Sequence, residues 1–132
     1  MKVDYAIICD DLRQEITNKF IAIGIYGGTI NVEKFPWAQR MAALIAVHEV
    51  RADETIKIMF SLSSGSTVAQ GTVDVKAEKT PDSLALIAMP AIPLMLSGPD
   101  TIILTVEMAN GDRVDAARIS VQKGPVGKAT TP

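Results

Sequence analysis

The feature that most constrains the fold is an alternation of apolar and other side chains with a period of two. Alternate residues of a β-strand point to opposite faces of its sheet, so this period is typical of strands with one buried face. The alternation runs through four segments of common strand length, VDYAIIC (3–9), KFIAIGIY (19–26), TIKIMFSL (55–62) and TIILTVEM (101–108). Helical patterns are nearly absent, and the sequence therefore predicts an all-β chain.

Short polar segments rich in glycine separate the strands. We predict hairpin turns at SSGS (63–66) and NGD (110–112), because Gly and Asn tolerate the backbone angles of tight turns. The glycines at 27–28 end a strand sharply. A change of phase in the last apolar segment predicts a β-bulge near Ala116-Ala117.

Two segments depart from simple alternation. Three prolines in MPAIPLMLSGPD (89–100) predict that a strand is interrupted there by an edge or a loop crossing. The run ALIAVHEV (43–50) could continue a helix that starts at Pro36, but the surrounding β pattern favours a short turn and then a strand. That strand is apolar on both faces, with Ala42, Leu44 and Ala46 on one side and Ala43, Ile45 and Val47 on the other.

These elements predict one antiparallel β-sandwich of about eight strands, immunoglobulin-like or C2-like, because turns recur roughly every 8 to 12 residues without crossover helices. The chain of 132 residues is the size of a single domain. We expect the domain to span residues 1–123 and residues 124–132 to form a disordered tail.

The outer faces of this sandwich are predicted to be unusually apolar. Besides the strand around residue 45, the pattern assigns Ile8, Ile87 and Ile103 to outward faces. A sandwich that works as a monomer keeps its outer faces polar. We therefore expect a surface for self-association, in keeping with how common isologous dimers are.

Charge and composition exclude several classes of function. The net charge is -2 and the Lys and Arg residues are scattered, which predicts no partner among nucleic acids or anionic membranes. One cysteine permits no intrachain disulfide and fits a reducing compartment. The N-terminal apolar run is too short for a signal peptide, so we expect a cytoplasmic protein. No phosphate loop or dinucleotide fingerprint occurs, and no cofactor is predicted.

The segment CDDLRQE (9–15) concentrates the charged groups, namely Cys9, Asp10, Asp11, Arg13 and Glu15. If Tyr5, Ile7 and Cys9 form the buried face of the first strand, Asp11 and Arg13 continue that face. They would then pair at the rim of the core through charge-assisted hydrogen bonds, while Asp10 and Glu15 face solvent or cap the turn. We interpret the segment as structural.

Two functional interpretations of the charged residues stay open. Loop carboxylates could bind calcium or a small ligand, although their spacing matches no metal motif; the candidates are Asp10, Asp11, Asp53, Glu54, Asp112 and Asp115. Cys9 could serve a hydrolase with His48, the only histidine. Neighbouring acidic groups would raise the thiol pKa, so an enzyme is disfavoured.

Two aromatic residues are candidate contacts for a partner. Trp37 follows Pro36, and Tyr26 precedes the two glycines. Either could be an exposed anchor, or could pack over the open end of the sandwich.

The N-terminal pattern resembles a family of small uncharacterised bacterial and phage proteins, a domain of unknown function. The shared order is an apolar strand, C-D-D-x-R-x-E, then G-I-Y-G-G and an F-P pair, here AIICDDLRQEITNKFIAIGIYGGTINVEKFP (6–36). The resemblance implies a β-sandwich without an established activity. Its signature residues would be Cys9, Asp10, Asp11, Arg13, Glu15, Gly24, Tyr26 and Gly27.

The sequence thus predicts a non-enzymatic protein-binding or assembly module that forms homo-oligomers. A calcium- or ligand-binding module is the alternative, and a cysteine-dependent hydrolase is a remote one.

Overall fold

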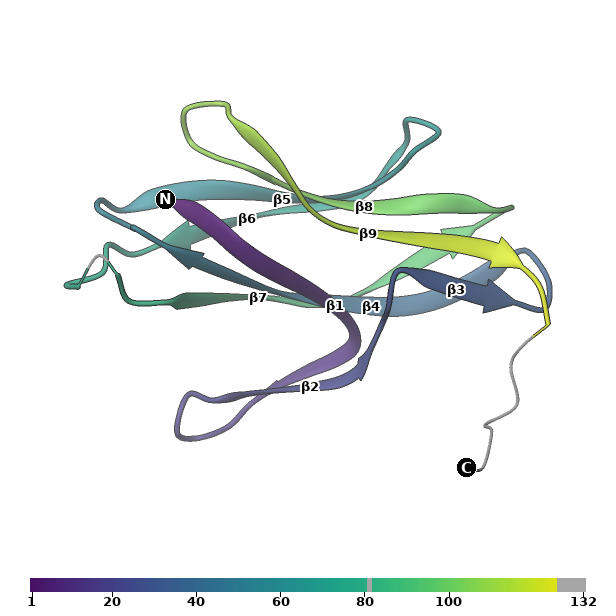
Figure 1. The fold of residues 1–132 in the computed structure, drawn as a ribbon, viewed down its shortest axis with the longest axis horizontal. Helices are drawn as coiled ribbons and strands as arrows, with labels where there is room; N and C mark the ends of the chain where they lie inside the picture. The colour runs from purple at the N-terminus through teal and green to yellow at the C-terminus, as the bar shows by residue number, and fades with distance from the viewer. Residues whose placement is uncertain (81, 126–132) are drawn as a thin grey trace.

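The regular secondary structure of the described residues is all β. The computed structural model describes residues 1–80 and 82–125, in which there are nine strands, and Figure 1 shows how they are arranged. The strands are β1 (Lys2–Gln14), β2 (Phe20–Ile25), β3 (Thr29–Val32), β4 (Trp37–His48), β5 (Glu54–Leu62), β6 (Thr67–Val75), β7 (Ala85–Leu96), β8 (Asp100–Glu107) and β9 (Arg113–Lys123). The described residues include no helix that could cross a membrane.

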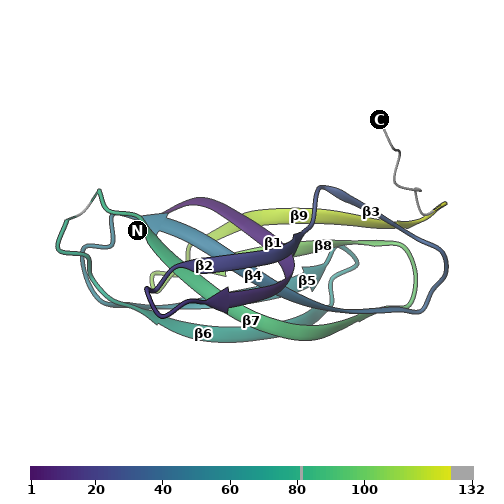
Figure 2. The same ribbon diagram turned by 90° about the horizontal axis from the view of Figure 1, so that it is seen from below.

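The strands form two sheets that lie face to face, as the views in Figures 1 and 2 agree. One sheet has the order β2-β1-β4-β7 and the other the order β3-β9-β8-β5-β6. All neighbours are antiparallel except β3 and β9, which are parallel. The predicted all-β sandwich is therefore confirmed, with nine strands where about eight were expected and one parallel pair that was not.

The core between the sheets is built from alternate residues of the central strands. β5 and β8 supply the predicted apolar sets, including Ile58, Phe60 and Leu104, which are almost fully buried. β4 supplies Ile45 and Val47 from the opposite sheet. Burying a side chain of this kind contributes roughly 1.5 to 3 kcal/mol, so these strands hold the two sheets together.

Three hairpins share one turn geometry. In each, a backbone hydrogen bond closes a four-residue turn whose last residue has a positive φ; these last residues are Asn18, Gly65 and Gly111. This is the three-residue hairpin loop in which a left-handed residue forms a bulge. The hairpins predicted at SSGS and NGD are confirmed, and the third at the end of β1 has Asn in place of Gly.

The predicted bulge in β9 is also confirmed. Leu104 lies opposite Ala117 and Thr105 lies opposite Asp115, which leaves Ala116 as the extra residue. A second irregularity lies in β1, where Val3 pairs with Val47 and Tyr5 with Ala46, so Asp4 is extra.

The bulge at Asp4 reverses the face that we expected β1 to bury. Beyond it Ile8 points into the core and is 2% exposed. Tyr5, Ile7 and Cys9 point to the outer side of the sheet, because they pair with Ala46, Leu44 and Ala42. The outward assignment of Ile8 is therefore wrong. That of Ile87 is wrong as well, because Ile87 pairs with Ile45 on the core side of β7 and is 5% exposed.

We predicted that the prolines of β7 would interrupt the strand, but β7 is continuous from Ala85 to Leu96. β7 is an edge strand, and a register shift opposite Met41 and Ala43 leaves an extra residue in its Pro90-Ala91 region. Edges and bulges are the places where a sheet tolerates a residue without an N–H.

The reversed face of β1 gives a direct test. Replacing Ile8 by Ala should lower the free energy of unfolding by about 2 to 5 kcal/mol, because the substitution leaves a cavity in the core. Ile7→Ala removes the same number of atoms from the outer face and should cost about 1 kcal/mol or less. Urea unfolding of both variants measures the difference, and an equal or inverted order would contradict this assignment.

Candidate functional site

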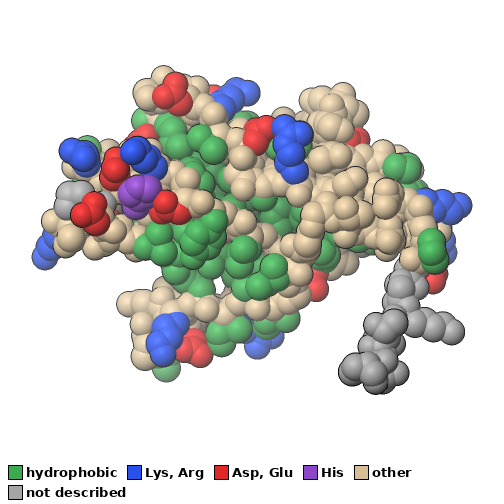
Figure 3. Space-filling view, viewed as in Figure 1, with side chains coloured by type: hydrophobic (Ala, Val, Ile, Leu, Met, Phe, Trp, Pro, Cys, Tyr) green, Lys and Arg blue, Asp and Glu red, His purple; other side chains and the backbone are tan. Residues whose placement is uncertain are grey.

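The outer face of the β2-β1-β4-β7 sheet carries a continuous set of apolar side chains. Strand register places these side chains on one side of the sheet, opposite the core. We call this set the apolar outer face, and its members are Tyr5, Ile7, Cys9, Ile21, Ile23, Ile25, Ala42, Leu44, Ala46, Leu86, Ala88 and Met95. Figure 2 is seen from the side of this sheet, and Figure 3, viewed along the edge of the two sheets, shows hydrophobic side chains in the centre of the view.

The rim of this face is exposed to solvent, while its centre is not. Ile23 is 42% exposed, Ile25 60% and Met95 65%. Ala42 and Ala46 in the middle of β4 are fully buried, although they lie on the side of the sheet opposite the core. The isoleucine side of β2 is thus a surface that water contacts, although its composition is that of a core.

Charged residues lie at both ends of the apolar outer face. At one end His48 Nδ1 lies 2.8 Å from Asp4 Oδ2, and Lys2 Nζ lies 3.5 Å from Glu49 Oε1. At the other end Arg13 Nε lies 3.5 Å from Asp11 Oδ2. An apolar centre with a polar rim of both signs is the usual anatomy of a protein–protein interface.

The Asp11–Arg13 pair forms as expected but in a different place. The two side chains are 48% and 70% exposed, so they lie on the outer face and not at the rim of the core. The predicted partly buried ion pair is therefore wrong, and the reason is again the reversed face of β1. Glu15 is exposed in the turn after β1, as predicted.

Asp10, which we expected to face solvent, is the residue of this segment that contacts the body of the molecule. Its Oδ1 accepts hydrogen bonds from the Tyr26 hydroxyl and from Gln39 Nε2, the latter at 2.8 Å. Gly24 lies against the same carboxylate with φ of +69°, and a Cβ there would collide with it. Asp10 thus joins three strand segments at one point.

The Asp10 network bridges a split in the sheet. β1 pairs with β4 only as far as Cys9 and Ala42, and then turns away with β2 as a hairpin. Figure 1 shows that hairpin projecting from the two sheets. We call the gap beside β4 the split; the hollow over it, of about 530 Å³, is lined by Asp10, Ala38, Gln39, Arg40, Pro93 and Leu94.

The two aromatic candidates are both packed and not free anchors. Tyr26 and Trp37 are partly buried against the core, so each covers part of the interior. Burial and the bond to Asp10 raise the pKa of the Tyr26 hydroxyl, because ionisation would place a second negative charge beside the carboxylate.

Cys9 and His48 do not meet. Cys9 is opposite Ala42 and His48 is opposite Lys2, so six residues of β4 separate the two sites, about 20 Å at the usual rise. Burial, followed by the charges of Asp10 and Asp11, raises the pKa of the Cys9 thiol. The arrangement opposes a thiolate nucleophile.

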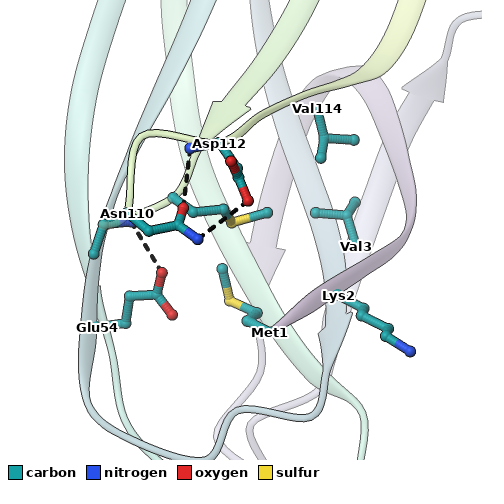
Figure 4. Close-up of a pocket in the computed structure, with 9 residues that line it drawn as sticks. Met1, Lys2, Val3, Glu54, Asn110, Asp112 and Val114 are labelled. Carbon is teal, nitrogen blue, oxygen red and sulfur yellow. Dashed lines mark hydrogen bonds between the residues drawn. The ribbon is translucent and has the colours of Figure 1, made fainter.

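The carboxylates proposed for calcium are dispersed among structural contacts. Glu54 and Asp112 line one hollow of about 620 Å³, shown in Figure 4, but each holds the β8–β9 turn. Glu54 Oε1 accepts from the Ala109 amide at 3.0 Å, and Asp112 bonds with Asn110. Asp53 accepts from the Ala77 amide, and Asp115 pairs with Arg118 at 2.7 Å. Residues 1–80 and 82–125 contain no group of three His, Cys, Asp or Glu that could hold a metal ion.

The comparisons with known proteins give no information about the function. No protein-family model matches the chain, and no curated protein matches it. The resemblance to a family of unknown function therefore stays a prediction. Of its signature residues, Asp10, Gly24 and Tyr26 meet at the split, while Asp11, Arg13 and Glu15 do not join them.

Asp10 and Arg13 belong to the same charged segment, but their substitution should change the free energy of unfolding by different amounts. Asp10→Ala leaves the Tyr26 hydroxyl and the Gln39 amide without their acceptor and should cost about 1 to 3 kcal/mol. Arg13→Ala removes an exposed ion pair and should change the free energy of unfolding by less than about 0.5 kcal/mol. Chemical denaturation of both variants tests this, and a larger cost for Arg13→Ala would refute the placement.

Tyr26 should make the protein sensitive to alkaline pH. Its folded-state pKa is raised, so below pH 10 both states hold the proton, and above it the unfolded chain loses the proton first. The free energy of unfolding should therefore fall with rising pH in this range. Above pH 10, the melting temperature of Tyr26→Phe should fall less steeply with rising pH than that of the parent. The melting temperature of the control Tyr5→Phe, on the outer face, should change with pH as in the parent.

Proposed function

We propose that this chain is a protein-binding and assembly module that pairs with a second copy of itself through the apolar outer face. The observation that carries the proposal is the exposure of three isoleucines on one side of β2, the side that also carries the outward apolar residues of β1 and β4. Soluble monomers rarely keep such a continuous patch exposed. A cytoplasmic location is part of the proposal and fits a single cysteine without a disulfide partner.

The exposed part of the face lies on β2. Ile21, Ile23 and Ile25 are 43%, 42% and 60% exposed, whereas the residues of the face on β4 are buried. The isoleucines of β2 are therefore the centre of the contact that we propose.

The charges at the rim favour a second copy as the partner. Each end of the face carries both signs, Asp11 with Arg13 at one end and Lys2 with Glu49 at the other. A two-fold axis brings a surface against itself, so a surface with both signs at each end can satisfy its own charges. A binding role is favoured over an enzymatic one because Cys9 and His48 lie at separate places in the sheet.

Self-association gives the decisive measurement. The chain should sediment as a dimer at micromolar concentration, and Ile23→Asp should weaken the dimer by at least about tenfold, since it places an unpaired charge in the interface. Its melting temperature, measured on the monomer, should stay close to that of the parent because Ile23 is exposed.

Ile103→Asp is the matched control. Ile103 lies on the outer side of the other sheet, between Ser61 and Arg118. This variant should remain dimeric. A parent chain that stays monomeric at high concentration, or equal effects of the two substitutions, would overturn the proposal.

A further inference from the structure

The split leaves one edge of β4 without a neighbouring strand. From Trp37 to Met41, β4 pairs with β7 on one side, and within the described residues no strand pairs with it on the other. The Asp10–Gln39 hydrogen bond spans the gap with side chains. Main-chain groups along this edge of β4 are therefore free to bind an added strand.

The proline opposite Arg40 settles which main-chain groups face the split. In an edge strand, a proline is placed with its nitrogen toward solvent, because it has no hydrogen to donate. Pro93 is the partner of Arg40, so this pair does not exchange main-chain hydrogen bonds, and the N–H and C=O of Arg40 point away from β7. Ala38, two residues earlier, presents its main chain in the same direction. The split is thus lined by two donors and two acceptors.

A hollow lies beside these groups. Asp10, Gln39 and Leu94 line it, together with the exposed residues Ala38 and Arg40. The Arg40 side chain is exposed, and among the described residues its Nη2 makes one long contact of 3.4 Å, to the Ala91 carbonyl. It is available to a negatively charged partner.

The occupant that fits is a single extended segment. A strand from a folded sheet carries a neighbouring strand on at least one side, and that neighbour would collide with β1, which forms the far wall of the split at Asp10. A linear peptide has no such neighbour. Arg40 selects a carboxylate at the position across from it, since a guanidinium and a carboxylate form two parallel charge-assisted bonds.

We propose that the split is a strand-addition site that takes one extended segment of a partner protein, with an Asp or Glu side chain opposite Arg40. The added strand would pair with the main chain of Ala38 and Arg40, in the manner by which peptides extend an open sheet edge. The proposal goes beyond self-association, because it uses a different part of the sheet and another kind of partner.

Blocked peptides and NMR test the site on the full chain. The probes are Thr-Val-Thr-Glu-Val-Thr, the same peptide with Lys in place of Glu, and one with N-methylated valines. Titration of the Glu peptide should shift the amide signals of Ala38 and Arg40 and slow their hydrogen exchange. The Lys peptide should bind on the order of tenfold more weakly, and the N-methylated peptide should not bind.

Two variants separate main-chain from side-chain recognition. Arg40→Glu should invert the preference between the Glu and Lys peptides. Ala38→Pro removes one N–H that faces the split and should weaken all peptides, while the control Ala38→Ser should not. Binding that shifts only signals of the apolar outer face, a preference unchanged in Arg40→Glu, or absence of binding at millimolar peptide would overturn the proposal.

Discussion

The structure depends on β4, a strand that is buried along both of its faces. Met41 to Val47 are almost inaccessible to water, with one set of side chains in the core and the alternate set on the outer side of the sheet. This strand lies between β1 and β7 in the middle part of its sheet, and a run of residues apolar on both faces is typical of such an interior strand. The outer residues of β1 and β7 extend the apolar surface.

The departure of β1 from β4 shows how one carboxylate replaces several main-chain bonds. Strands in a sheet are normally held by repeated N–H to C=O pairs. At the split that ladder ends, and Asp10 holds Tyr26 and Gln39 in its place. The same point sets the direction of the β1–β2 hairpin, since Gly24 must lie against the carboxylate. A few side chains at the split thus determine how the β1–β2 hairpin is placed relative to β4.

Much of the fold follows from the local pattern, whereas the site depends on pairing between distant segments. The buried set of β8, the turns at Gly65 and Gly111 and the bulge at Ala116 were all predictable, because each depends on neighbours within a few residues. The face of β1 was not, since both of its faces are apolar and the extra residue Asp4 leaves no local mark. Periodicity decides a face only where the two faces differ.

The role of Asp10 was hidden for a related reason. Its partners are 16 and 29 residues away, and nothing in CDDLRQE distinguishes it from Asp11. The one local signal was Gly24 within an otherwise apolar strand, because a glycine at such a position often marks a close approach of another group. The sequence predicted an apolar outer face because the strand around residue 45 is apolar on both sides. Ile8 and Ile87, which we first assigned to outer faces, belong to the core.

The prolines of β7 limit how far any assembly of this chain can grow. An edge strand with a regular row of donors can add further copies without end and so seed fibres. Pro90 and Pro93 remove two of these donors from the free edge of the sheet, and the bulge beside them disturbs its register. In the dimer that we propose, the outer face is covered in a single contact, which closes on itself. The sheet can therefore expose aliphatic residues for pairing while its edge opposes polymerisation.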